Sequence, residues 1–220
     1  MEASEILHGL GQAVFDYDPE AAADWARQAV TEKLDPLVAL AALTDAIRQV
    51  GDGFARCDLF LPDLVGAADA LQSAMPIVEE AIRRKGMKRE SLGTVVIGTV
   101  FGDIHTIGKS MVASLLTAEG FDVHDLGIDV PTEKFVEGVK SYDASILALS
   151  ALLTTTAPEA KKVIQSLEKE GLRQKVKVMV GGGAITEDFA SNIKADGYSP
   201  TAPGAIRVAK NLVGLGKGGR

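Results

Sequence analysis

Apolar residues recur every three or four positions from residue 3 to about residue 85, which is the spacing of one face of an α-helix. Pro19, Pro36 and Pro62 fall where the first turn of a helix tolerates proline. The pattern predicts four helices, around residues 6–14, 22–29, 37–50 and 64–82. Because the connections between them are short, we expect an antiparallel four-helix bundle.

The pattern changes after residue 92, where short β-branched runs alternate with helical segments. Strands are predicted at residues 95–100, 122–126, 145–149, 176–180 and 197–198. Helices are predicted to begin near Gly108, Thr132, Pro158, Thr186 and Pro203. This alternation indicates a three-layer α/β domain of the flavodoxin or Rossmann kind, with a five-stranded parallel sheet.

A basic segment separates the two patterns. Five of the seven residues from Arg83 to Arg89 are lysine or arginine. We expect an exposed linker at about residues 83–91 rather than a nucleic-acid site, because the whole chain is acidic. The predicted domains are therefore a helical cap at 1–89 and an α/β domain at 92–213, with a glycine-rich flexible tail at 214–220.

Composition narrows the function classes. The formal net charge of -7 over 220 residues argues against nucleic-acid binding, which needs clustered basic residues. A single cysteine, Cys57, excludes an internal disulfide framework. The acidic N-terminus does not resemble a signal peptide, and no apolar stretch is long enough to cross a bilayer. We expect a cytoplasmic protein with no membrane or nucleic-acid partner.

Three predicted loops follow strands whose carboxyl ends lie on one edge of the sheet, where open α/β sheets bind ligands. The first loop contains Asp103, His105 and Gly108. The second is rich in small and hydroxylated residues from 149 to 158, and the third begins with three glycines at 181–183. Together they predict a slot with hydroxyls on one wall and bare backbone on the other, with an imidazole at its mouth.

Four occupants fit such a slot to different degrees. A mononucleotide phosphate is suggested by Gly108-Lys109-Ser110, but five residues rather than four separate Gly102 from Gly108. A plain metal ion is poorly supported, because the chain has three histidines and no cysteine pair. A loop histidine bonded to Asp103 in a sensory domain explains His105 but not the slot. A large cofactor whose metal takes an imidazole explains both.

The same residues resemble a known signature. Asp103-x-His105-x-x-Gly108, then Ser150-x-Leu152, then Gly181-Gly182, is similar to the motif of cobalamin-binding domains. The resemblance is to the corrinoid proteins of methanol and methylamine methyltransferase systems and to the cobalamin-binding module of methionine synthase. It covers about residues 35–215 and extends to four further positions, which are Thr154, Thr156, Phe54 and Leu61.

The resemblance implies a role for each of these positions. A cobalamin or related corrinoid, as methylcob(III)alamin or cob(I)alamin, is expected with its own base displaced and His105 as the axial cobalt ligand. Asp103 and Thr156 extend the bond from His105, and Thr154 lies beside the displaced base. Phe54 and Leu61 cover the upper face of the corrin. Two departures are Gly183-Ala184, where the family commonly has Ala-Pro, and Cys57, where it tends to have glycine.

The function implied by the resemblance is a corrinoid-carrying subunit that shuttles a methyl group on cobalt. A substrate-specific methyltransferase loads it, and a second methyltransferase unloads it to a thiol or tetrahydrofolate-type acceptor. A reductive activator completes the expected partners, so the chain is a non-autonomous component of an enzyme system. The alternative is a cobalamin-dependent sensor or regulator, and a mutase subunit ranks last because it lacks the helical cap.

Overall fold

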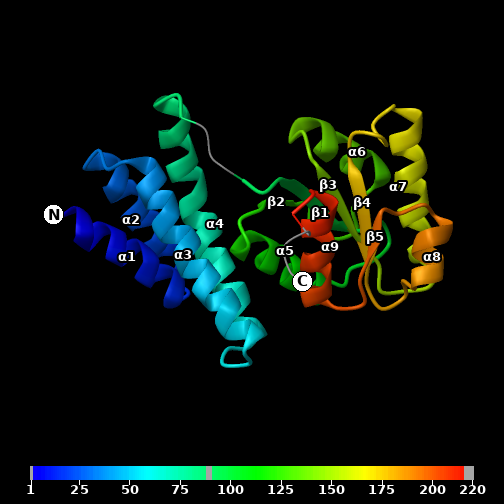
Figure 1. Ribbon diagram of the computed structural model, residues 1–220, viewed down its shortest axis with the longest axis horizontal. Coiled ribbons are helices and arrows are strands. Elements are labelled where there is room, and N and C mark those ends of the chain that lie inside the picture. The colour runs from blue at the N-terminus through cyan, green and yellow to red at the C-terminus, as the bar shows by residue number, and fades with distance from the viewer. Residues whose placement is uncertain (1, 88–90, 216–220) are drawn as a thin grey trace. The chain divides into compact units, whose positions relative to one another are not determined.

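The computed structural model describes residues 2–87 and 91–215, which form two compact units (Figure 1). One unit is helical and N-terminal, and the other is built on a β-sheet. The predicted linker falls partly on residues 88–90, and the predicted tail falls mostly on 216–220. Both of these stretches lie outside the described residues.

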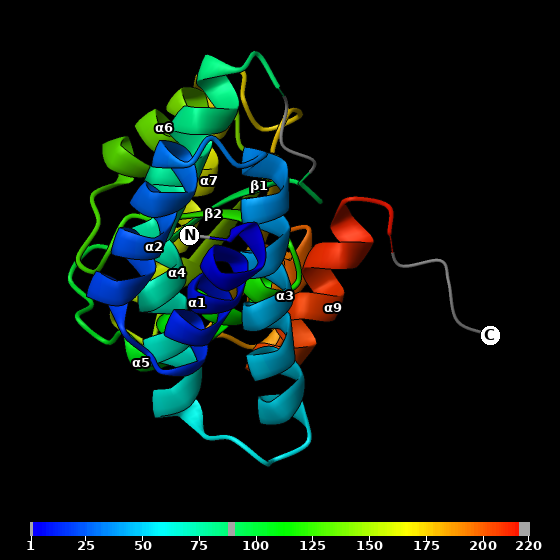
Figure 2. The same ribbon diagram turned by 90° about the vertical axis from the view of Figure 1, so that its left-hand side faces the viewer.

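The helical unit consists of α1 (Ala3–Phe15), α2 (Pro19–Thr31), α3 (Pro36–Ala55) and α4 (Leu61–Arg84). The carboxylates of Asp18 and Asp35 accept hydrogen bonds from backbone N–H groups in the first turns of α2 and α3, which explains why these helices begin at the two prolines. Helices α1 and α4 each contact both α2 and α3 extensively (Figure 2). The predicted N-terminal bundle is therefore confirmed.

The second unit contains five parallel strands in the order β2-β1-β3-β4-β5. Their bounds are β1 (Thr94–Thr99), β2 (Asp122–Asp125), β3 (Ile146–Ser150), β4 (Lys177–Gly181) and β5 (Gly197–Tyr198). The predicted parallel sheet is confirmed. Strand β1 begins one residue earlier than predicted and β3 and β4 begin one residue later, because apolar runs that are buried on both faces carry no sharp end signal.

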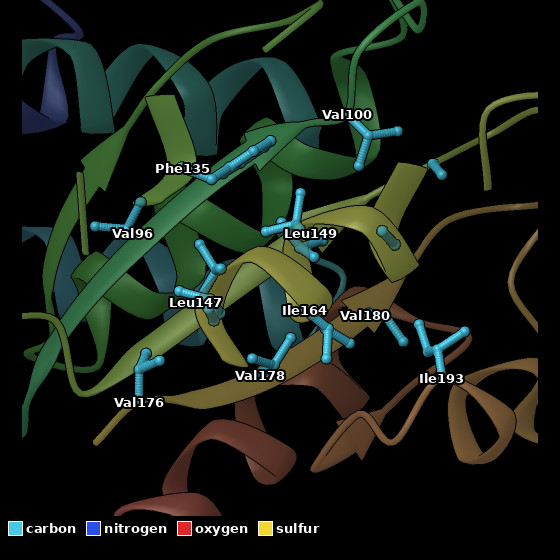
Figure 3. Close-up of a cluster of buried hydrophobic side chains, with 14 of the residues drawn as sticks. Val96, Val100, Phe135, Leu147, Leu149, Ile164, Val176, Val178, Val180 and Ile193 are labelled. Atoms are coloured by element: carbon cyan, nitrogen blue, oxygen red, sulfur yellow. The ribbon is translucent and has the colours of Figure 1, made fainter. Parts of the chain in front are cut away.

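Helices cover both faces of the sheet. Figure 1 shows α6 (Thr132–Ser141), α7 (Ala157–Lys169) and α8 (Glu187–Asn192) on one side, and α5 (Ile107–Ala118) and α9 (Ala202–Leu212) on the other. Side chains from β1, β3 and β4 pack with α6, α7 and the end of α8 into one buried apolar cluster (Figure 3). The labelled members include Val96, Phe135, Leu147, Ile164, Val178 and Ile193.

Strand order determines where a ligand site can form. The chain leaves β1 toward β2 on one side and later returns to place β3 on the other side, so a crevice opens at the carboxyl ends of β1 and β3. The register pairs Thr99 with Ser150 and Ser150 with Gly181. The three predicted loops therefore begin side by side at one edge of the sheet.

Candidate functional site

His105 lies in the loop between β1 and α5, and its ring is held from one side only. Its Nδ1 atom lies 2.8 Å from Oδ1 of Asp103, and its backbone N–H donates to the same oxygen at 3.1 Å. The side chain is 48% exposed. In the neutral tautomer whose Nδ1–H donates to this carboxylate, Nε2 carries the lone pair, and no described residue hydrogen bonds it.

The carboxylate of Asp103 has no exposed surface and is surrounded by hydrogen-bond donors. Besides His105, its Oδ2 atom accepts from the backbone N–H of Leu152 at 2.8 Å and from the Thr156 hydroxyl at 2.7 Å. Burial raises the pKa of Asp103, but the hydrogen bonds from Leu152, Thr156 and His105 outweigh it and hold the pKa well below its ordinary value. The group is therefore a fixed negative charge behind the imidazole.

Thr156 reaches this carboxylate from the far side of the crevice. It directly precedes α7, is nearly buried, and lies 53 positions along the chain from Asp103. The loop before it turns back at Leu153, whose carbonyl accepts from the backbone N–H of Thr156 at 3.1 Å. The structure thus brings Asp103, His105 and Thr156 into one hydrogen-bonded row.

A cavity of about 510 Å³ opens beside this row in the sheet unit. Five predicted residues line it, namely Gly108, Ser150, Leu152, Gly181 and Gly182. A methyl group added at Gly108 meets no atom within 4 Å, so this residue leaves space open. At Gly182, with φ of +111°, the same methyl lies 2.1 Å from the Ala151 carbonyl oxygen, so this glycine permits close packing of two loops.

The remaining predicted residues lie elsewhere. Thr154 is exposed in the loop between β3 and α7 and does not line the cavity. Phe54 lies near the end of α3, and Leu61 is the first residue of α4. Both side chains are half-buried within the helical unit.

Several cavity residues were missed by the sequence analysis. Tyr198, at the end of β5, and Ser199 and Thr201, in the loop after it, also line the cavity. The rule that singled out the other loops, a parallel strand followed by small or hydroxylated residues, applies to this one as well. Lys109 also lines the cavity but is buried, and its ammonium pairs with Asp125 at the end of β2. The lysine of the phosphate-loop interpretation therefore already has a carboxylate partner.

Exposed apolar side chains frame the imidazole. They come from the three loops around Asp103, which are joined by hydrogen bonds from the backbone N–H groups of Leu152 and Asp129 to Asp103. Their members are Phe101, Ile104, Ile107, Ile128, Leu152 and Leu153, each between 42% and 69% exposed. We call these six side chains the apolar rim, since exposed apolar side chains gathered on loops that meet at one edge of a sheet are typical of a ligand-binding surface.

Residues 2–87 and 91–215 contain no group of three or more metal-ligating side chains. Within the same ranges, no helix is both long and apolar enough to cross a membrane.

Comparison with known proteins agrees with this geometry. Two family models, each described as a B12 binding domain, match residues 6–79 and 93–207. Trimethylamine corrinoid protein 1 of Methanosarcina acetivorans is 40% identical over 92% of this chain and 94% of its own. Dimethylamine corrinoid protein 1 of Methanosarcina mazei is 40% identical over 95% of this chain and 96% of its own.

A solved structure is similar over nearly the whole chain. It is the methanol:cobalamin methyltransferase complex MtaBC of Methanosarcina barkeri, which matches with a TM-score of 0.79 and 30% identity. The match covers 96% of this chain and 81% of the other.

Proposed function

Because this chain belongs to the family of B12-binding corrinoid proteins, we propose that it is the methyl-carrying subunit of a methyltransferase system and holds its corrinoid through His105. The main observation behind the proposal is how the two ring nitrogens of the His105 imidazole are hydrogen bonded. Its Nδ1 is hydrogen bonded to a buried carboxylate, the side chain is 48% exposed, and its Nε2 has no hydrogen-bond partner among the described residues. This is the arrangement of a histidine prepared to ligate a metal.

The residues present fit a corrinoid. The apolar rim around His105 suits the flat face of a macrocycle, and the cavity beside it accepts an appendage of about 510 Å³. Gly108, Gly181 and Gly182 present bare backbone to this cavity, and the space beside Gly108 is open. We propose Ser150 and Leu152 as further contacts of the appendage, and Thr154 as an outer contact.

We propose that Asp103 and Thr156 set the tautomer and the basicity of the His105 imidazole. A carboxylate that accepts the Nδ1 proton fixes the tautomer of His105 and makes Nε2 more basic. The Thr156 hydroxyl keeps that carboxylate in place and charged. When bound, the corrinoid supplies the cobalt centre that accepts and releases the methyl group. The chain itself supplies binding, orientation and a fixed charge, and we propose that it has no turnover alone.

The proposed partners follow from the carrier role. A substrate-specific methyltransferase loads the corrinoid, a second one transfers the methyl group to a thiol or tetrahydrofolate-type acceptor, and a reductive activator restores the cofactor. We propose a methylated amine as the donor class, because relatives named for trimethylamine and dimethylamine are each 40% identical to this chain. In the helical unit, Phe54 and Leu61 are the proposed cover of the corrin. No feature of the described residues favours the sensor alternative.

Isotope labelling tests the axial ligand. The full chain is reconstituted with hydroxocobalamin, the bound cobalt is reduced to Co(II), and its electron paramagnetic resonance is recorded. Ordinary protein should show a triplet splitting from one axial nitrogen, and protein grown with [15N]histidine should show a doublet. His105→Ala should abolish this change, whereas the matched variant His124→Ala, in the same unit on β2, should keep it.

Two outcomes contradict the proposal. Hydroxocobalamin that separates from the wild-type chain on gel filtration contradicts corrinoid binding. A triplet that persists in [15N]histidine-labelled protein shows that the axial nitrogen belongs to the cofactor rather than to His105.

A further inference from the structure

Asp129 is a residue to which no motif drew attention, yet it holds the loop that presents His105. It lies between β2 and α6, on the neighbouring loop of the crevice. Its Oδ1 atom accepts the backbone N–H of Gly102 at 2.6 Å. In return, its own backbone N–H donates to the Asp103 carbonyl at 2.9 Å. Two adjacent residues of the His105 loop are thus bound by one side chain and one amide of Asp129.

The segment around Asp129 is itself well anchored. The Val130 side chain is 4% exposed, its backbone N–H donates to the Thr99 carbonyl at 3.0 Å, and it forms a parallel bridge with Val100. On the other side of Asp129, the Gly127 carbonyl accepts the backbone N–H of Thr99 at 3.0 Å. The segment therefore runs beside the end of β1 and cannot drift from it without breaking these contacts.

The backbone of Asp129 is in the left-handed region, with φ of +52°. A non-glycine residue in this region carries a conformational cost, although aspartate and asparagine tolerate it better than most residues. Such strain persists when the surrounding contacts over-determine it, and it gathers at functional sites. In this conformation, both the side chain and the backbone N–H of Asp129 hydrogen bond to the His105 loop.

A further contact holds the other end of the loop. The buried hydroxyl of Thr99 donates to the carbonyl of His105 at 2.9 Å. The hydrogen bond from Nδ1 to Asp103 orients the ring relative to Asp103, but it does not fix the backbone that carries both residues. That backbone is held by the hydrogen bond from the Asp103 N–H to the Val100 carbonyl, by Asp129 at its start and by Thr99 at its end.

We propose that Asp129 is a positioning residue that holds the His105 loop ready for metal ligation. The inference rests on the proposed function. Removing the Asp129 carboxylate frees the backbone N–H of Gly102, so the start of the loop samples several conformations. Only a fraction of them would present Nε2 correctly, so the apparent affinity for the corrinoid falls by that fraction.

Three substitutions separate the hydrogen bond from the backbone strain. Asp129→Gly removes the acceptor and relieves the strain, and Asp129→Ala removes the acceptor and keeps the strain. Asp129→Asn keeps an acceptor oxygen and tolerates the left-handed region. Asp143→Ala is the matched control, because Asp143 is exposed at φ of +47° after α6 and makes no contact with the His105 loop.

Three measurements on the full chain test the effect. Amide hydrogen exchange at Gly102 should be about tenfold faster in Asp129→Gly and Asp129→Ala, as expected for the loss of one hydrogen bond to a charged group. The dissociation constant for hydroxocobalamin should rise by a similar factor, and the [15N]histidine-dependent signal should be partly lost. Asp129→Asn and Asp143→Ala should resemble the wild type in all three respects.

The outcomes distinguish this inference from the proposed function. If wild-type protein binds hydroxocobalamin through His105 and Asp129→Gly leaves both affinity and ligation unchanged, Asp129 has no positioning role. If Asp129→Gly speeds exchange at Gly102 without altering ligation, its role is limited to loop stability and the inference is likewise overturned. If wild-type protein does not bind hydroxocobalamin, the proposed function fails first and this inference fails with it.

Discussion

At the scale of single residues, a carboxylate without exposed surface is stable only where hydrogen-bond donors replace water. Asp103 meets this condition with donors from His105, Leu152 and Thr156. The pairing of Asp103 with His105 could be predicted because the two residues are local in sequence, whereas Thr156 was predicted only through the family resemblance. The donation from Leu152 could not be predicted, because it depends on where the backbone of another loop passes.

Removing one of these donors should destabilise the sheet unit. Thr156→Val keeps the shape of the side chain but deletes the hydroxyl, and we expect the free energy of unfolding to fall by about 2 kcal/mol. Urea denaturation of the cofactor-free chain measures this loss. Thr156→Ser retains the hydroxyl and is the control, and a Thr156→Val variant that is as stable as Thr156→Ser would contradict the role of the hydroxyl.

Two glycines of the same site should respond oppositely to alanine. Gly182→Ala places a methyl on the Ala151 carbonyl and adds strain at positive φ, which should cost about 3 kcal/mol or more. Gly108→Ala adds a methyl within α5 where nothing lies within 4 Å, and it should stabilise the chain by about 0.5–1 kcal/mol. Thermal unfolding compares them, and a large destabilisation by Gly108→Ala would contradict the open space assigned to it.

At the scale of helices and strands, the residues at the helix ends explain where α2 and α3 begin and where α3 and α4 end. Aspartates that cap the first turns, followed by prolines, begin α2 and α3 where the sequence predicts. Glycine commonly follows a helix in the left-handed conformation, as Gly86 does after α4. Cys57 occupies the equivalent place after α3 with φ of +64°, where glycine avoids the steric cost.

Replacing this cysteine should therefore stabilise the helical unit. Cys57→Gly removes the unfavourable contact of the Cβ atom in the left-handed region, and we expect a gain of about 1 kcal/mol in the free energy of unfolding. Cys57→Ala removes the thiol but keeps Cβ, so it should give no gain. A similar gain in both variants, measured by urea denaturation, would show that the thiol rather than the backbone is responsible.

At the scale of the whole molecule, the chain has two units, and each has a buried core of its own. The helical unit has its own buried side chains, and the sheet unit has a separate apolar cluster on the face that α6, α7 and α8 cover. Two distinct family models match them, over residues 6–79 and 93–207. Since each unit buries its own core, we expect each to keep its local stability when the other is weakened.

Core truncations in each unit test this independence. Leu43→Ala, at a fully buried position of α3, should cost about 2–5 kcal/mol and raise amide exchange throughout the bundle. Exchange in β1 and β3 should stay unchanged. Leu147→Ala in β3 is the matched variant and should show the reverse pattern. Equal loss of protection in both units after either substitution would show that they unfold as one.

The sequence alone was sufficient to predict the helical bundle, the parallel sheet, and the pairing of Asp103 with His105. Each of these depends on the period of apolar residues or on groups two positions apart, which are local properties. Only the tertiary structure placed Asp129 on the His105 loop, buried Lys109 against Asp125, and brought the loop after β5 to the cavity. These contacts depend on strand order and register, which join residues distant in sequence and leave no local pattern.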